Sequence, residues 1–242
     1  MAIIPATAAV FFDLDDTLFD HSFSVVAGLG ALRQALPAFG GRDLEELTAI
    51  HARDLEMFHA RVLQGEMTLY EARVARFASL CRACGFAEER AERVAEMYRD
   101  AYQRARRAVP GARELLLALR GRVVVGVISN NVVEEQVDKL RALDMRALVD
   151  VLVISEEAGV AKPDPAIFRI ALERAGSAPE RAVMVGDSWA ADIIGARAAG
   201  IRPVWLNRRA APVPKNERCD EVASLAPTDD FLKLLLDQRD AL

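Results

Sequence analysis

The sequence predicts an α/β protein: a parallel sheet whose strands alternate with helices, interrupted once by a helical insertion. Three observations predict it. From residue 109 onward, short apolar runs alternate with amphipathic helical patterns. From about residue 22 to 107 the chain carries only helical periodicity. Before that stretch lies a single apolar run, which ends in the acidic segment VFFDLDDTL at residues 10–18. One strand therefore precedes the insertion and the other strands follow it.

The core elements follow from this alternation. A fully buried strand is expected at 8–13, because the run is short, apolar and ended by a polar turn. The helical pattern breaks at Val109-Pro110-Gly111. After it we expect strands at 123–128, 151–154, 182–185 and 203–206, helices at 112–120, 132–142, 165–175 and 190–199, and a final amphipathic helix at 228–240.

The insertion is expected to be a bundle of four helices. The first spans about 22–36 and ends before Pro37. The other three each place apolar residues on one side, in the sets Leu44, Leu47, Ile50, Leu55, Phe58, Val62, then Phe77, Leu80, Cys81, Cys84, then Val94, Met97, Tyr98, Ala101, Tyr102. The expected domains are a core of 1–18 with 109–242 and a helical cap of 19–108.

Composition limits the partners. The chain has 242 residues, of which 52% are apolar, so it can bury a substantial core. Its net charge of −5 argues against a nucleic acid polymer as a partner. No apolar run is long enough to span a membrane. Three cysteines are too few for a disulfide framework, which favours a reducing cytoplasm. A monomer and a homodimer both remain open.

Polar clusters interrupt the pattern of the core at the ends of its predicted strands. In an open parallel sheet these ends meet at one edge, where ligands bind. That edge is therefore the expected site. The clusters are Asp13-Leu14-Asp15, Ser129-Asn130-Asn131, Lys162-Pro163-Asp164-Pro165, and Gly186-Asp187-Ser188 with Asp192.

Three of the acids predict a metal. Carboxylates that end a buried strand repel one another and are costly to desolvate, so a cation is expected beside them. Asp13, Asp15 and Asp187 offer hard oxygen ligands without a neighbouring Cys or His, a set that favours Mg²⁺ over zinc. Asp192 is open to three interpretations. It is a metal ligand, an acid at the start of a helix, or, as we favour, a residue that holds the metal ligands in place without binding the metal itself.

The other clusters predict a phosphate site. Ser129 supplies a hydroxyl, and the amide of Asn130 precedes a helix, where N–H groups can face an anion. Lys162 supplies a compact positive charge. Asp164 and Pro165 stand where an N-cap and a first helical residue belong, which would fix the loop that carries Lys162.

These groups together predict phosphoryl chemistry. Asp13, at the end of the buried strand, is the expected nucleophile and would form an aspartyl phosphate. Asp15 would protonate the leaving oxygen and later take a proton from water. Lys162 and the metal would hold the charge of the transferring group. The expected substrate is a small phosphorylated metabolite.

The four clusters, in this order, resemble the four motifs of the haloacid dehalogenase-like (HAD) superfamily. The helical insertion resembles the type 1 cap of subfamily I. The resemblance covers nearly the whole chain. It implies a Rossmann-like core with strand order 5-4-1-2-3, which places Asp13 beside Asp187, and a cap that closes over the substrate. It also gives Thr17 a supporting role in the site.

Asp15 narrows the choice of activity within this superfamily. The dehalogenases of this superfamily lack the second Asp of the first motif and need no metal, so Asp15 favours a phosphatase. The stretches LVISEEAGVAKPDPAIF and VMVGDSWAADIIGARAAGI look most like the pyrimidine 5′-nucleotidase branch. That resemblance implies a nucleoside 5′-monophosphate as substrate, with phosphoglycolate or a sugar phosphate as the alternative. A dehalogenase, a phosphomutase and a non-catalytic phosphate-sensing module are less favoured.

The remaining polar residues of the insertion carry weaker expectations. Asp20, His21 and Phe23 follow the acidic turn and are candidates for substrate specificity. His51 and His59 are expected to be surface or packing residues. Cys81 and Cys84 lie on one apolar stripe, which favours a packing role over a redox or metal site.

Overall fold

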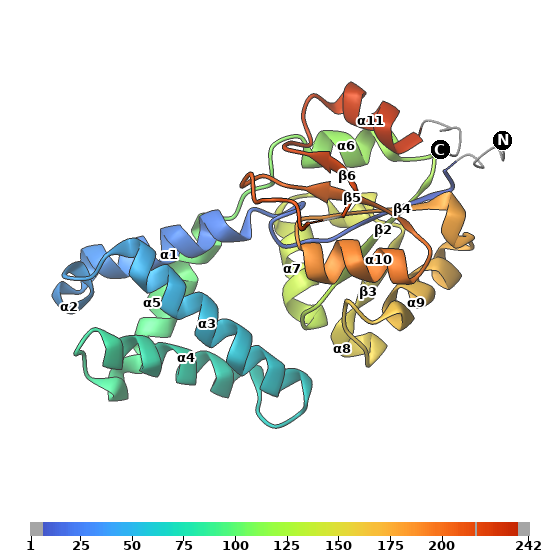
Figure 1. Cartoon of the computed structure of the whole chain (residues 1–242). Coiled ribbons are helices and arrows are strands. Elements are labelled where there is room, and N and C mark those ends of the chain that lie inside the picture. The colour runs from blue at the N-terminus through green and yellow to red at the C-terminus, as the bar shows by residue number, and fades with distance from the viewer. Residues whose placement is uncertain (1–6, 216, 237–242) are drawn as a thin grey trace. The chain divides into compact units, whose positions relative to one another are not determined.

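The computed structural model describes residues 7–215 and 217–236, and the chain divides into two compact units (Figure 1). The core unit comprises the residues up to Asp20 and those from Arg107 onward. The helical unit comprises His21–Arg106. The sequence placed these boundaries at 18/19 and 108/109. Among the described residues, no helix is both long and apolar enough to cross a membrane.

The core unit is built on a parallel sheet in the order β3-β2-β1-β4-β5-β6. The order of the first five strands agrees with the expected one. The sixth strand was not predicted, since it is short and polar and lies at the edge of the sheet, where it pairs with β5. The strands are β1 (Ala9–Phe12), β2 (Val124–Ser129), β3 (Val151–Ile154), β4 (Ala182–Gly186), β5 (Arg202–Leu206) and β6 (Asp220–Val222).

The register of the central strands aligns their carboxyl ends. Phe12, the last residue of β1, pairs with Val127 of β2 and with Val185 of β4. The residues that follow these three strands therefore emerge at the same edge of the sheet. This edge is the one that the sequence marked with polar clusters.

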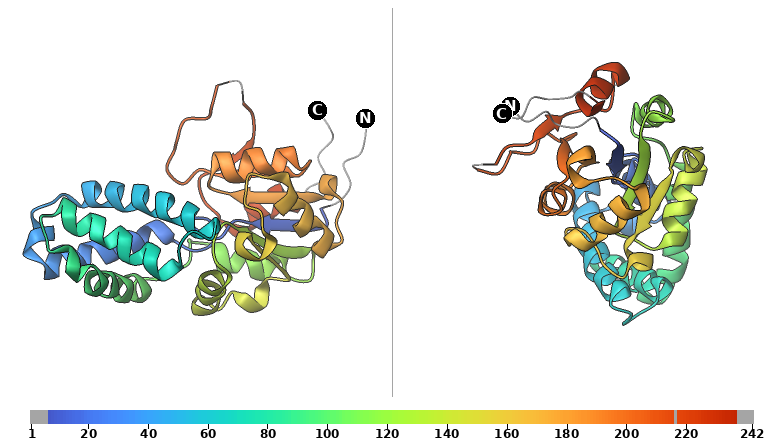
Figure 2. Two further views of the ribbon diagram at one scale, coloured as in Figure 1. Left: turned by 90° about the horizontal axis from the view of Figure 1, so that it is seen from below. Right: turned by 90° about the vertical axis from the view of Figure 1, so that its right-hand side faces the viewer.

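Helices cover both faces of the sheet, as Figure 2 shows for the core unit. The helices α9 and α10 pack on each other and on strands of the sheet, while α6 packs on β2 and on α11. The described helices of this unit are α6 (Ala112–Leu119), α7 (Val133–Ala142), α8 (Ser155–Ala158), α9 (Pro165–Ala175), α10 (Gly195–Ala198) and α11 (Thr228–Leu236). Residues 237–240 of the expected last helix lie outside the described residues.

The helix expected at 190–199 takes a different form. Residues Trp189–Ile194 form a π-helical turn, capped by the Ser188 side chain, and α10 continues from it. Such turns often mark functional sites. This one follows directly on the acidic cluster at the end of β4.

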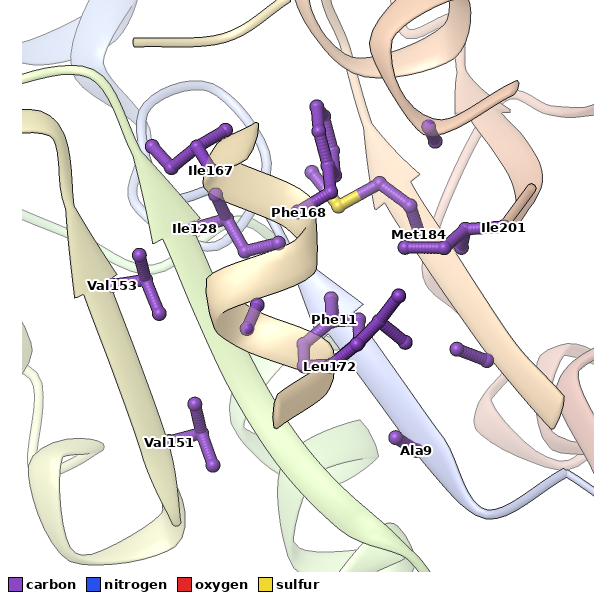
Figure 3. Packing of buried hydrophobic residues seen from close by; sticks show 13 residues of the cluster. Ala9, Phe11, Ile128, Val151, Val153, Ile167, Phe168, Leu172, Met184 and Ile201 are labelled. Carbon is purple, nitrogen blue, oxygen red and sulfur yellow. The ribbon is translucent and has the colours of Figure 1, made fainter. Parts of the chain in front are cut away.

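The core on one face of the sheet lies under α9 (Figure 3). Ile167, Phe168 and Leu172 of this helix pack against Phe11 of β1 and Met184 of β4. Each fully buried side chain of this size contributes about 1.5–3 kcal/mol. All four residues of β1 are buried, so the strand that carries Asp13 at its end is held rigidly in the middle of the sheet.

The helical unit consists of α1 (His21–Ala35), α2 (Pro37–Gly40), α3 (Leu44–Leu63), α4 (Leu69–Ala83) and α5 (Ala91–Arg104). Helix α1 packs on α5, and α3 packs on α4. The short helix α2 was not predicted. The apolar stripes expected for α4 and α5 form a shared core that contains Phe77, Leu80, Cys81, Val94 and Tyr98.

Helix α3 differs from expectation. Its buried residues are Leu47, His51 and Asp54, whereas Leu55 and Phe58 are only half-buried. The spacing of the buried residues, i, i+4 and i+7, is that of one helix face, and two of the three are polar. On the predicted side, Leu47 is part of the core and Leu44 and Ile50 pack against it. Hydrophobicity alone therefore located part of the buried side and missed His51 and Asp54.

Candidate active site

Lys162 joins two of the predicted acids. Its Nζ donates to Asp13 Oδ1 and to Asp192 Oδ1, at 2.6 Å in each case. All three residues are buried, and Asp192 is fully inaccessible. Asp13 follows β1 directly, and its backbone N–H donates to Val185 O of β4. The end of the first strand and the loop before α9 thus meet through a buried ion pair.

Asn130 holds the loop that carries Lys162. Its Nδ2 donates to Lys162 O at 2.8 Å, and the Lys162 N–H donates to Asn130 Oδ1 at 2.7 Å. Asp164 caps α9 by accepting from the Ala166 N–H, and Pro165 is the first helical residue, as predicted. The Asn130 side chain is therefore engaged with the backbone of Lys162, and the proposed contact with phosphate falls to its main-chain amide.

The acidic cluster consists of Asp13, Asp187 and Asp192. One carboxylate oxygen of each lies within 4.8 Å of the others. Asp192 is anchored by the Ser188 N–H, which donates to its second oxygen, Oδ2, at 3.0 Å. The carbonyl of Asp187 accepts from Trp205 Nε1 at 2.9 Å. Backbone and side-chain donors thus fix the acids before any cation is added.

Gly186, the last residue of β4, allows this arrangement. A Cβ added to it would collide with the carboxylate group and Cβ of Asp192. Any other residue at this position would push Asp192 away from Lys162. The glycine is required by this close approach, since its backbone is that of an ordinary strand residue.

The charges of the site shift its pKa values. Burial, together with the neighbouring Asp192 and Asp16 carboxylates, raises the pKa of Asp187 to about 7. Burial also raises the pKa of Asp13, while the Lys162 ammonium opposes that shift. Burial alone would lower the pKa of Lys162, but Asp13 and Asp192 raise it above its usual value. Lys162 is therefore a permanent cation among three acids.

This cluster could hold a metal ion. Three carboxylates face one ammonium, so the site carries an excess of negative charge that a cation would neutralise. Both oxygens of Asp192 already accept hydrogen bonds. The Asp187 carboxylate accepts none from a described residue. All donors are carboxylate oxygens, the ligands of hard cations such as Mg²⁺ and Ca²⁺.

The Asp15 carboxylate has other partners. Lys139 Nζ donates to both of its oxygens, at 2.7 and 2.8 Å, and Gln136 Nε2 donates to Oδ2 at 3.1 Å. The same Gln136 Nε2 lies 2.6 Å from Ser129 Oγ. Asp15 as a side-chain ligand of the metal stays a prediction, and in this structure its carboxylate faces helix α7.

Gln136 and Lys139 were not predicted to belong to the site. Both are buried residues of α7, one helical turn apart, and both lie beside the buried Leu140. A signal was present: with Leu140 facing inward, Gln136 four residues earlier must share that face.

The remaining candidates are Thr17, Asp20, His21 and Phe23. Thr17 is fully buried, and its Oγ1 has no hydrogen-bond partner among the described residues. The buried Asp20 carboxylate pairs with Arg107 at 2.7 Å and with Arg208 at 3.3 Å. In the helical unit, His21 Nδ1 lies 2.9 Å from the Tyr102 hydroxyl, and the Phe23 side chain is exposed. A role in specificity stays a prediction for Asp20, His21 and Phe23.

Known proteins resemble this chain over most of its length. Residues 7–200 match the family model described as haloacid dehalogenase-like hydrolase. Pyrimidine 5′-nucleotidase YjjG of Escherichia coli K12 is 33% identical over 82% of this chain and 85% of its own length. Glyceraldehyde 3-phosphate phosphatase of Methanothermobacter thermautotrophicus is 32% identical over the same shares of the two chains.

A solved structure supports the fold. The HAD-hydrolase YfnB of Bacillus subtilis, solved with bound magnesium, superposes with a TM-score of 0.74 at 23% identity, covering 96% of this chain and 99% of that one. The resemblance drawn from the four motifs is thereby confirmed by family, relatives and fold. The chain belongs to the haloacid dehalogenase-like hydrolase family.

Proposed function

We propose that this protein hydrolyses a phosphomonoester through an aspartyl phosphate on Asp13, with Mg²⁺ as its cofactor. One observation carries the proposal: the Lys162 ammonium holds Asp13 at the end of β1, within a cluster of acids that could bind a metal. A buried carboxylate with a fixed cation and an excess of negative charge around it suits a nucleophile that attacks phosphorus beside a divalent ion.

Asp13 and Asp187 are the proposed side-chain ligands of the metal. Bound Mg²⁺ would polarise a phosphoryl oxygen and offset the charge that develops on the transferring group. Lys162 would share that task and, with the bound metal, favour the ionised form of Asp13. The Ser129 hydroxyl and the main-chain amide of Asn130 would donate to the phosphoryl oxygens.

In the first step an Asp13 carboxylate oxygen attacks phosphorus. The bond between phosphorus and the ester oxygen breaks, and its electron pair leaves with that oxygen. Asp15 donates a proton to the departing oxygen, which gives a neutral alcohol. The products are the free alcohol, an aspartyl phosphate on Asp13 and an ionised Asp15.

In the second step a water molecule attacks phosphorus. Asp15 takes a proton from this water as the new P–O bond forms. The bond between phosphorus and the Asp13 oxygen breaks, and its electron pair returns to the carboxylate. Inorganic phosphate leaves, and Asp13 and Asp15 are restored, so one water is consumed for each ester.

The proposed substrate is a nucleoside 5′-monophosphate. The likeness to pyrimidine 5′-nucleotidase YjjG, which spans both units of the chain, supports this choice. The likeness to glyceraldehyde 3-phosphate phosphatase supports the alternative, a sugar phosphate or phosphoglycolate. Asp15 argues against a dehalogenase, because a proton donor for the leaving oxygen serves ester cleavage.

The free cysteines Cys81, Cys84 and Cys219 agree with the proposed cytoplasmic location.

Phosphate release from a substrate panel tests the proposal. The panel contains UMP, dUMP, dTMP, glyceraldehyde 3-phosphate, phosphoglycolate and phosphoserine, each assayed with Mg²⁺ and with EDTA. We expect release with Mg²⁺, none with EDTA, and the highest kcat/KM for a nucleotide. Asp13→Asn should lower kcat by roughly 10⁴-fold or more, as loss of a nucleophile does.

The matched control is Asp230→Asn, which makes the same change at an exposed position and should leave activity intact. A folded Asp13→Asn variant that turns over at the wild-type rate would refute the nucleophile assignment. Full activity in EDTA would refute the metal. A panel without any phosphate release would leave the non-catalytic phosphate-sensing module as the better explanation.

A further inference from the structure

Two residues of α7 contact the proposed proton donor. Lys139 Nζ bridges both oxygens of the Asp15 carboxylate, at 2.7 and 2.8 Å. Gln136 Nε2 donates to Asp15 Oδ2 at 3.1 Å and lies 2.6 Å from Ser129 Oγ. Gln136 is fully buried and Lys139 almost so. One helix face therefore touches the end of β1 and the end of β2 at once.

The stability of the fold does not account for this cation. The Asp15 side chain is 28% exposed, so water can hydrate it, whereas that of Lys139 is only 5% exposed. Burying an ammonium to pair it with an acid that water already reaches contributes little to stability, and an apolar side chain of similar volume often serves a protein as well. The arrangement does, however, fix the direction of the Asp15 carboxylate.

Lys139 is itself held in place. Its Nζ lies 5.3 Å from the centre of the Phe19 ring, on the side chain that ends the acidic turn. The ammonium thus lies between the ring face of Phe19 and the carboxylate of Asp15, both of which belong to the loop that begins at Asp13. Asp15 Oδ1 accepts from Lys139, and Asp15 Oδ2 accepts from both Lys139 and Gln136, so the carboxylate is held at both of its oxygens.

Gln136 links the same carboxylate to the phosphate site. A carboxylate only accepts, so the group that faces Asp15 is the amide Nε2, a donor. The same nitrogen then donates to Ser129 Oγ, which leaves the Ser129 hydroxyl proton free to be donated elsewhere. That proton is the one a phosphoryl oxygen would accept.

We propose that Lys139 and Gln136 are positioning residues: Lys139 orients the Asp15 carboxylate for proton transfer, and Gln136 orients the Ser129 hydroxyl toward the phosphoryl group. This inference rests on the proposed function, because it assigns the two residues to the same reaction. It adds helix α7 to the parts of the chain that build the site.

A comparison of two esters with different leaving groups distinguishes a positioning role of Lys139 from a purely structural one. An alkyl phosphate needs a proton on its departing oxygen, whereas p-nitrophenyl phosphate releases a stable anion that needs none. Lys139→Met should therefore lower kcat/KM, which reports the steps up to the aspartyl phosphate, about 10–100-fold more on an alkyl phosphate such as UMP than on p-nitrophenyl phosphate. This is part of the roughly 10²–10⁴-fold that general acid catalysis contributes. KM for both esters should change little. Lys139→Arg, which keeps the charge, should recover part of the loss.

Gln136→Leu should act on both esters alike, because the phosphoryl group is common to them. Lys233→Met is the matched control for Lys139→Met, since Lys233 is exposed, and it should leave both rates unchanged. Thermal unfolding checks that each variant folds. If Lys139→Met does not fold, the comparison of Lys139→Arg with wild type on the two esters decides the matter.

An equal loss of kcat/KM on both esters, a rise in KM alone, or no change in Lys139→Met would overturn the inference. A wild-type protein that releases phosphate from neither ester would instead refute the proposed function. The direction of the Asp15 carboxylate in crystal structures of wild type and Lys139→Met then decides the positioning by itself: an unchanged rotamer would overturn it.

Discussion

Lys162 Nζ lies 2.6 Å from an oxygen of Asp13 and 2.6 Å from an oxygen of Asp192. These acids lie far apart in the sequence, one after β1 and one in the turn after β4. A single buried ammonium therefore ties three segments together at the sheet edge. Its removal would leave two buried carboxylates without a cation, in addition to Asp187.

Lys162→Met is expected to destabilise the core unit. Breaking a buried ion pair by removing one partner costs about 3–5 kcal/mol, because the remaining charge stays desolvated. The free energy of unfolding from urea denaturation at pH 7 measures the loss. Both tryptophans lie in the core unit and all three tyrosines in the helical unit, so tryptophan fluorescence reports the relevant transition.

Combining Lys162→Met with Asp192→Asn should recover part of this stability, since one uncompensated charge is removed. Lys233→Met serves as the exposed control and should change the unfolding free energy little. An unfolding free energy for Lys162→Met within about 0.5 kcal/mol of wild type, the usual range for surface substitutions, would contradict the importance given to this ion pair.

Gly186→Ala tests the same cluster without altering a polar group. The added methyl would collide with Asp192, which must then move away from Lys162 and from the Ser188 N–H. We expect phosphatase activity to fall at least roughly 100-fold, because small displacements in a catalytic site have effects of this size. Isothermal titration should also show weaker binding of Mg²⁺.

Gly30→Ala is the matched control for this substitution. Its Cβ would meet no atom within 4 Å, and it lies inside helix α1, where alanine is favoured over glycine. This variant should keep its activity and gain a few tenths of a kcal/mol to about 1 kcal/mol in stability. Wild-type activity in Gly186→Ala would show that Asp192 can move without consequence.

The strand ends were predictable because parallel topology dictates where they meet. Asp13, Ser129 and Asp187 each follow a short apolar run, and such strands are buried on both faces. Once the alternation of strands and helices is recognised, one sheet edge must collect these residues. Asp164 and Pro165 were predictable for a local reason, the chemistry of the helix N-terminus.

Side-chain partners across the fold were harder to predict. In the sequence, Lys139 has the pattern of an ordinary polar residue on a helix surface. Its contact with Asp15 results from the packing of α7 against the sheet edge. Asn130 could be assigned to the site from its position, but its bonds to the Lys162 backbone depend on the path of a loop 32 residues away. Distances of this kind are set by tertiary packing, which periodicity does not encode.

Helix α3 shows the same limit in the helical unit. Its buried side contains His51 and Asp54, which a hydrophobic pattern excludes from a core. His51 fits there because its ring packs on aromatic partners, 5.0 Å from the Tyr98 ring and 6.0 Å from the Phe77 ring. The sequence left His51 as a surface or packing residue, and the structure places it in the packing.

His51 makes the helical unit sensitive to acid. It is 2% exposed, and its Nε2 has no hydrogen-bond partner among the described residues. Burial lowers the pKa of His51 well below its usual value, and the charges of Arg76 and His21 add to this shift. In the unfolded chain the imidazole titrates near its ordinary pKa of about 6.5.

The sign of the effect follows from proton binding. Below about pH 6.5 the unfolded chain takes up a proton at His51 that the folded chain does not accept until a lower pH. The contribution of His51 to the free energy of unfolding should therefore be constant above this pH and fall as the pH decreases, by up to about 1.4 kcal/mol per pH unit. His51→Phe keeps an aromatic ring and removes the proton site, so this part of the slope should vanish.

Urea unfolding between pH 5 and 8 measures the slope, with tyrosine fluorescence reporting the helical unit and tryptophan fluorescence the core unit. We expect His51→Phe to flatten the pH dependence of the tyrosine transition and to leave that of the tryptophan transition as in wild type. Carboxylates that titrate in the same range contribute equally to both proteins, so the difference isolates His51. Equal slopes for the tyrosine transition in the two proteins would mean that His51 accepts its proton as readily in the folded unit as in the unfolded chain.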